Sequence, residues 1–161
     1  MMIQELTKQQ SLDLVPIFSE MENYYFGANA ATKEEIATYL LNGVFSDYSG
    51  VHVVAYYDES EVVGFTTFSI LFPAPNLSGQ LFMKDLFVSA DARGEKVGQQ
   101  LMRYLAQLAI EHGVRRFDWT AESTNPKAGQ FYHAIGAQLI QEKQYYRFEG
   151  DELRRFAEHQ P

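Results

Sequence analysis

Hydrophobic and polar residues follow two different periods along this chain, and the change between them predicts the order of its elements. Apolar side chains recur every three to four residues over 7–25 and over 97–112, which is the spacing of one face of a helix. Thr32, followed by Glu35, forms a capping box that predicts another helix over 32–41. Each helical stretch is bounded by runs of a different pattern.

Those runs are rich in β-branched, aromatic and aliphatic residues and predict strands. Strands are expected at 3–6, 51–58, 61–71, 80–90, 115–121, 137–141 and 144–150, with the last two as a terminal pair. Further helices are expected at 125–136, between Pro126 and Gly136, and at 151–159. With no repeat, low-complexity tract or linker, the sequence predicts one domain over 1–161, of α/β (α+β) class, with a mixed and mostly antiparallel sheet.

Composition agrees with a folded domain of this kind. The 161 residues are 46% hydrophobic and 21% charged, as in ordinary globular proteins. The longest apolar stretch, 62–72, is interrupted by polar residues and is too short to span a membrane. The first residues resemble no signal peptide. There are no cysteines, which excludes disulfides and a cysteine nucleophile and favours a cytoplasmic location.

The net charge of −8 argues against a nucleic-acid-binding protein, because such proteins carry a basic surface. An anionic ligand would therefore have to be held by a local arrangement of cations and main-chain donors. The four histidines show no spacing typical of metal ligands, so no metal site is expected.

One such arrangement is the stretch 91–100, between a predicted strand and a predicted helix. It contains Arg93, Gly94, Lys96 and Gly98. Exposed N–H groups and the positive end of the dipole make a helix N-terminus a good binding site for phosphate. Taken alone, the stretch is equally consistent with a strand-to-helix turn that carries solvated charges.

This loop resembles a known family motif. The stretch 93–98, RGEKVG, is similar to the Q/R-x-x-G-x-G/A pyrophosphate loop of the GNAT superfamily of N-acetyltransferases. Lys96 stands where the family has a glycine, and a lysine there can still donate its main-chain N–H if its φ stays negative. The stretch 125–137 resembles the family's N…A…FY…GA segment, and the resemblance is densest over 79–156.

The resemblance implies a GNAT fold, with a six- to seven-stranded sheet whose fourth and fifth strands are splayed apart. Acetyl-CoA would lie in that gap, and one main-chain N–H would polarise the thioester carbonyl. No metal is implied. The implied cofactor site consists of Leu86, Phe87, Val88, Arg93, Gly94, Glu95, Lys96, Val97, Gly98, Gln99 and Asn125.

The resemblance also implies a catalytic role for Tyr132, as the acid that protonates the departing thiolate. A phenol, with a pKa of about 10, is protonated at neutral pH and close to a thiolate in basicity. Without the loop and Asn125, Tyr132 would be interpreted as an aromatic residue that packs its helix onto the sheet. The implied reaction is acetyl transfer from acetyl-CoA to a primary amine of a small molecule, by direct attack in a ternary complex.

The sequence specifies the acceptor amine less closely than it specifies the cofactor. The pattern is closest to the diamine (spermidine/spermine) acetyltransferase-like branch, which recognises polycations through carboxylates, yet Tyr25, Asn76 and Lys84 stand at three of those acidic positions. Lys84 is expected either to bind an anionic group of the acceptor or to form a cross-strand salt bridge near Asp85. The general base is Asp85, Glu122 or a water chain.

The sequence leaves two other functions open. One is a non-catalytic acyl-CoA-binding or sensing domain of the same fold, and the other is a general anion-binding α/β module. Members of the family that the chain resembles often dimerise through C-terminal strands. We therefore expect a homodimer whose interface includes the edge of the strand at 144–150. Its other partner would be the small-molecule amine, with no nucleic acid and no membrane.

Overall fold

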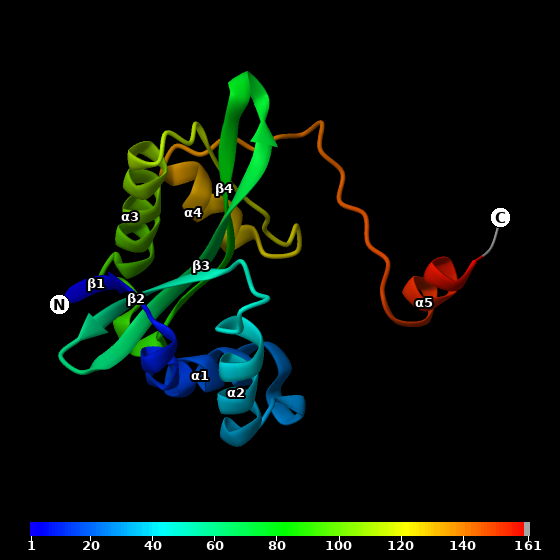
Figure 1. Ribbon diagram of the computed structural model, residues 1–161. Helices are drawn as coiled ribbons and strands as arrows, with labels where there is room; N and C mark the ends of the chain where they lie inside the picture. Colours follow the sequence, from blue (N-terminus) through cyan, green and yellow to red (C-terminus); the bar gives the residue numbers. More distant parts are fainter. Residues whose placement is uncertain (160–161) are drawn as a thin grey trace. The chain divides into compact units, whose positions relative to one another are not determined.

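The computed structural model describes residues 1–159, and the chain divides into two compact units, Met1–Thr120 and Ala121–Pro161. The first unit is built on a five-stranded sheet in the order β1-β2-β3-β4-β5, antiparallel except for β4 and β5 (Figure 1). Its strands are β1 Met2–Glu5, β2 His52–Asp58, β3 Glu61–Ala74, β4 Ser78–Val88 and β5 Arg116–Trp119. The mixed α/β class is confirmed, with fewer strands than the six or seven expected.

Three α-helices accompany this sheet: α1 Val15–Phe26, α2 Lys33–Tyr39 and α3 Val97–Glu111. The first predicted helix is divided, because a 3-10 helix over Lys8–Leu14 precedes α1. Pro16 lies in the first turn of α1, where its missing N–H costs nothing. The capping box of α2 is confirmed, since Thr32 Oγ1 accepts from the Glu35 N–H at 3.2 Å and Glu35 Oε1 accepts from the Thr32 N–H at 3.1 Å.

The helices cover opposite faces of the sheet, as the alternation of side chains along β3 shows. Phe65 is fully buried in a core cluster with Ile17 of α1 and Ile36 of α2. A Cβ added at its neighbour Gly64 would point to the other face, toward Val97 and Leu101 of α3. The sheet therefore has α1 and α2 on one face and α3 on the other. Within residues 1–159, no helix is long and apolar enough to cross a membrane.

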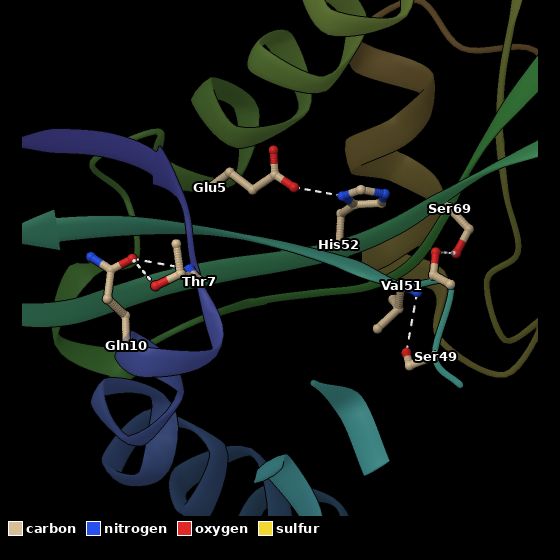
Figure 2. A network of polar contacts seen from close by, with 8 residues as sticks. Glu5, Thr7, Gln10, Ser49, Val51, His52 and Ser69 are labelled. Carbon is tan, nitrogen blue, oxygen red and sulfur yellow. Dashed lines mark hydrogen bonds and ion pairs between the residues drawn. The ribbon is translucent and has the colours of Figure 1, made fainter. Parts of the chain in front are cut away.

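Polar contacts attach the N-terminal segment to the sheet. Figure 2 shows the carboxylate of Glu5, on β1, beside the imidazole of His52 on β2. The Tyr57 hydroxyl, on β2, donates to Asp13 at 2.8 Å. Burial, and then this hydrogen bond, raise the pKa of Tyr57 to about 12, so the phenol stays neutral over the physiological range.

The second unit contains α4 Pro126–Ala134 and α5 Gly150–Glu158, which confirms both C-terminal helices. The predicted strands at 137–141 and 144–150 are wrong, because residues 137–149 pair with no strand in the described chain. β-Propensity reflects fit to a neighbouring strand rather than an intrinsic preference, so without a partner edge an apolar segment forms no ladder.

Candidate active site

The fourth strand has a free edge where the fifth strand ends. β4 pairs with β5 only from Gln80 to Met83, whereas its pairing with β3 continues to Val88. The register with β3 shifts between the pairs Thr67–Asp85 and Phe68–Met83, which makes Lys84 the extra residue of a β-bulge. The fourth and fifth strands therefore part at this bulge, as the resemblance implies.

The main-chain groups of Leu86 and Val88 face the open side. The Ser89 N–H donates to the carbonyl oxygen of Val63 at 2.9 Å, which sets the alternation of the ladder. By that alternation the main-chain N–H and C=O of Phe87 bond to β3, and those of Leu86 and Val88 face away from it. Arg93 Nε donates to the carbonyl oxygen of Val88 at 3.3 Å, consistent with this direction. Of the three predicted positions, Leu86 and Val88 present main-chain groups, while the Phe87 side chain is buried.

The loop after β4 ends at the N-terminus of α3. The first hydrogen bond of that helix runs from the Gln100 N–H to the carbonyl oxygen of Lys96, at 3.0 Å. The N–H groups of Val97, Gly98 and Gln99 therefore precede the helical ladder. Three main-chain donors beside Arg93 and Lys96 fit a pyrophosphate group, because the helix dipole favours an anion at this end.

Lys96 does not meet the condition of a negative φ. It has φ 62° and ψ 21°, so the lysine adopts the left-handed conformation that glycine would take there. The turn into α3 imposes this conformation, since Gly94, two residues earlier, also has a positive φ of 90°. The condition under which its N–H would still donate is therefore not met.

We expect Lys96→Gly to stabilise the protein while weakening its affinity for acetyl-CoA, the cofactor that the resemblance implies. Relief of the left-handed strain should contribute about 1 kcal/mol and raise Tm by roughly 2–4 °C. Loss of the ammonium should raise KM for acetyl-CoA by up to about fivefold. Calorimetry and steady-state kinetics measure the two effects. Lys96→Ala is the matched control, because it removes the charge and keeps the strain; equal stability of the two variants would contradict the prediction.

Arg93 is held in place by aromatic rings. Its guanidinium carbon lies 5.4 Å from the ring centroid of Tyr24 and 5.8 Å from that of Phe87. Glu20, on α1, attaches the same loop, since its Oε1 accepts from the Ala90 N–H at 2.8 Å and from Ser89 Oγ at 3.2 Å. Sequence reasoning did not assign this role to Glu20, because its partners lie about seventy residues away in the chain.

Two cavities lie beside the bulge, with volumes of about 260 and 480 Å³. Both are lined by Phe18, Tyr39, Lys84 and Asp85. Asp85 Oδ2 accepts from Thr67 Oγ1 at 3.0 Å, so its carboxylate is oriented by the protein. Each cavity is large enough for a small polar molecule.

The Lys84 side chain makes no hydrogen bond or ion pair with the described residues, so the expected alternative of a cross-strand salt bridge is not observed. Tyr25, at the end of α1, is electrostatically coupled to the same region. Partial burial raises the pKa of Tyr25, the nearby Tyr24 and Asp85 raise it further, and Arg93 opposes them. Asn76 lies in the 3-10 turn between β3 and β4.

The remaining predicted residues belong to the second unit. Asn125 caps α4, with its Oδ1 accepting from the Ala128 N–H at 3.3 Å. Tyr132 lies on α4, in a T-shaped contact with Phe131 at 5.3 Å between ring centroids. Glu122 is exposed. No cluster of His, Asp and Glu suited to a metal ion occurs among residues 1–159.

A mixed sheet whose fourth strand parts from the fifth, followed by a loop that opens onto a helix N-terminus, is the architecture that the resemblance to the GNAT superfamily implies. The acetyltransferase (GNAT) family profile matches residues 14–137, and the chain belongs to this family. This membership agrees with the resemblance found in its sequence.

Solved structures extend this likeness over nearly the whole chain. The integron cassette protein VCH_CASS6 from the mobile metagenome of V. cholerae is 56% identical, with a TM-score of 0.97 over 98% of both chains. A probable acetyltransferase shares the fold at 21% identity, with a TM-score of 0.78 over 94% of this chain and 99% of its own.

Curated relatives match over a shorter length. Thialysine N-epsilon-acetyltransferase of Sus scrofa is 28% identical over 48% of this chain and 47% of its own. L-ornithine N5-acetyltransferase NATA1 of Arabidopsis thaliana is 30% identical over 57% of this chain and 40% of its own. The matched region is therefore less than half of each of these relatives.

Proposed function

We propose that this protein transfers the acetyl group of acetyl-CoA to a primary amine of a small molecule, by direct attack in a ternary complex. The observation that carries the proposal is the free edge of β4 at Leu86 and Val88, which leads directly into the loop that opens α3. Acetyl-CoA, when bound, supplies the activated acetyl group. The names of the curated relatives, which act on thialysine and L-ornithine, support an acceptor of this size.

Each group of residues at the proposed site has its own role. One main-chain N–H of this edge, at Leu86 or Val88, stabilises the negative charge that develops on the carbonyl oxygen as the amine attacks, and the other main-chain groups hydrogen-bond the pantetheine arm. The N–H groups of Val97, Gly98 and Gln99 bind pyrophosphate, with Arg93 and Lys96 supplying countercharge and Gly94 and Glu95 shaping the turn. Asn125 contacts the pantetheine arm.

Two side chains move protons. Asp85 accepts the proton of the acceptor ammonium, since it lines both cavities and is oriented by Thr67, whereas Glu122 lies exposed in the second unit. Tyr132 donates a proton to the departing thiolate. The protons balance because the nitrogen loses two: the first goes to Asp85 before the attack and then to solvent, and the second, lost as the tetrahedral intermediate collapses, restores the proton that Tyr132 gave to the thiolate.

Turnover of acetyl-CoA, followed as free thiol, tests the proposal against polyamines, amino acids, amino sugars and peptide N-termini. We expect at least one acceptor to be acetylated, with the product confirmed by mass spectrometry. Heat protection by acetyl-CoA without turnover of any amine would favour the acyl-CoA-sensing domain instead. Equal protection by inorganic pyrophosphate and acetyl-CoA would favour a general anion-binding module.

We further propose a homodimer, and a cytoplasmic location supported by the cysteine-free sequence. Residues 137–149 expose large apolar side chains, including Leu139 at 81% and Tyr146 at 84%, while pairing with no described strand. An unpaired apolar segment of this kind is suited to strand addition across a two-fold axis.

Light scattering should give twice the chain mass of 18.4 kDa. Leu139→Lys should shift the mass toward the monomer, and a monomeric wild type at micromolar concentration would refute the proposal.

A further inference from the structure

The two cavities beside the bulge carry fixed charges of both signs. In the larger cavity Glu22, Glu35 and Asp85 contribute three carboxylates and Lys84 contributes one ammonium, and of these only Lys84 and Asp85 also line the smaller cavity. The remaining lining of the larger cavity is mostly apolar, with Phe18, Met21 and Ile36 among its residues. Glu22 and Asp85 are half-buried, where a charge acts on a ligand more strongly than on an open surface, whereas Glu35 and Lys84 are exposed.

The carboxylates are oriented by the protein and still have acceptor capacity. Glu22 Oε2 accepts from the Ala31 N–H at 3.4 Å, and Glu35 Oε1 accepts from the Thr32 N–H at 3.1 Å. Hydrogen bonds from Thr32 lower the pKa of Glu35, so that this group is an anion at neutral pH. An ionised carboxylate has about four lone-pair sites, and one bond to each leaves room for an ammonium group.

Lys84 does not neutralise any of these carboxylates. It lines both cavities, yet the ion pairs within residues 1–159 are His52–Glu5 and Arg154–Asp151, and neither involves it. The bulge explains the arrangement, because Lys84 is the residue without a β3 partner while the next residue, Asp85, stays in register with Thr67. The positive and negative charges are therefore kept apart, and a ligand with two oppositely charged ends would satisfy both.

We propose that the acceptor is an amino acid with a side-chain amine, and that Lys84 binds its carboxylate. This inference rests on the proposed acetyltransferase function and specifies its substrate class. Three anionic groups against one cationic group match a ligand with two ammonium groups and one carboxylate. A polyamine fits less well, because it would place an ammonium group beside Lys84.

L-Ornithine and putrescine provide the sharpest pair of probes, since they differ only by the carboxylate. We expect wild-type kcat/KM to favour L-ornithine by about tenfold or more, as one charge-assisted hydrogen bond would give. Lys84→Met should remove most of this preference, and Lys84→Glu should reverse it toward putrescine. Lys33→Met is the matched control, because it removes a lysine of α2 that does not line the cavities and should leave the preference unchanged.

Titration calorimetry of both amines against wild type and Lys84→Met supplies a second measurement that needs no turnover. Binding of L-ornithine that weakens about tenfold in the variant, while putrescine binding does not, supports the inference even if no amine is acetylated; only the proposed function then fails. Acetylation of both amines with equal kcat/KM, or a preference that persists in Lys84→Met, overturns the inference and leaves the acetyltransferase function intact. Absence of binding by either amine overturns the inference as well.

Discussion

Tyr132→Phe should lower kcat by about 10²–10⁴-fold, the range that a positioned general acid contributes. The substitution removes only the phenol oxygen, so the ring and its contact with Phe131 stay in place. Without that proton, the thiolate must leave as an anion or wait for water, and the barrier of that step rises. Steady-state kinetics with the best acceptor from the amine panel measure the effect.

The loss should fall on kcat rather than on cofactor binding. Calorimetry should give acetyl-CoA affinities for wild type and Tyr132→Phe that agree within about twofold, because the phenol acts on the leaving group. Tyr48→Phe, which removes a hydroxyl from a fully exposed side chain, is the control and should retain wild-type kcat. A Tyr132→Phe enzyme with normal kcat would show that another group or water protonates the thiolate.

Local patterns predicted the structural elements around the proposed site that depend on neighbours in the chain. The run from Arg93 to Gly98 is a continuous motif, and the structure places it at the start of α3, where three N–H groups precede the helical ladder. The same holds for α4, whose limits follow from Pro126 and Gly136. Caps and turns are specified by the residues that form them, so their signals survive in a single sequence.

Long-range features of the site left no such signal. The contact of Glu20 with the Ala90 N–H joins residues about seventy positions apart, and a glutamate on a helix face is usually solvated. The bulge at Lys84 depends on how β3 and β4 are paired, which periodicity does not reveal. The strands expected at 137–150 failed for a related reason, because an apolar segment becomes a strand only beside a partner.

Gly64 is another residue whose role appears only in the structure. An added Cβ there would lie 2.7 Å from Val97 Cγ1, 3.3 Å from Leu101 Cδ1 and 3.5 Å from the carbonyl oxygen of Phe87. Val97 and Leu101 are buried, so neither has free space into which to move. The missing side chain at Gly64 thus lets the first turn of α3 pack against β3, directly behind the proposed pyrophosphate site.

Gly64→Val should therefore impair stability and cofactor binding together. Overpacking of this kind costs about 1–3 kcal/mol, which corresponds to a fall in Tm of roughly 2–12 °C for a chain of this size. Displacement of Val97 should also weaken acetyl-CoA binding by about tenfold, because the N–H groups of the first turn lose their alignment. Differential scanning calorimetry and titration calorimetry measure the two effects.

Two further variants separate this mechanism from a general effect of valine in place of glycine. Gly50→Val, at a position where an added Cβ meets nothing within 4 Å, should change the free energy of unfolding by no more than about 0.5 kcal/mol. Val97→Ala in the Gly64→Val background should recover part of both losses, because it clears the atoms that the new side chain strikes. If binding recovers with stability, packing of α3 on β3 sets the position of the donors; if stability alone recovers, the valine disturbs the binding site by another route.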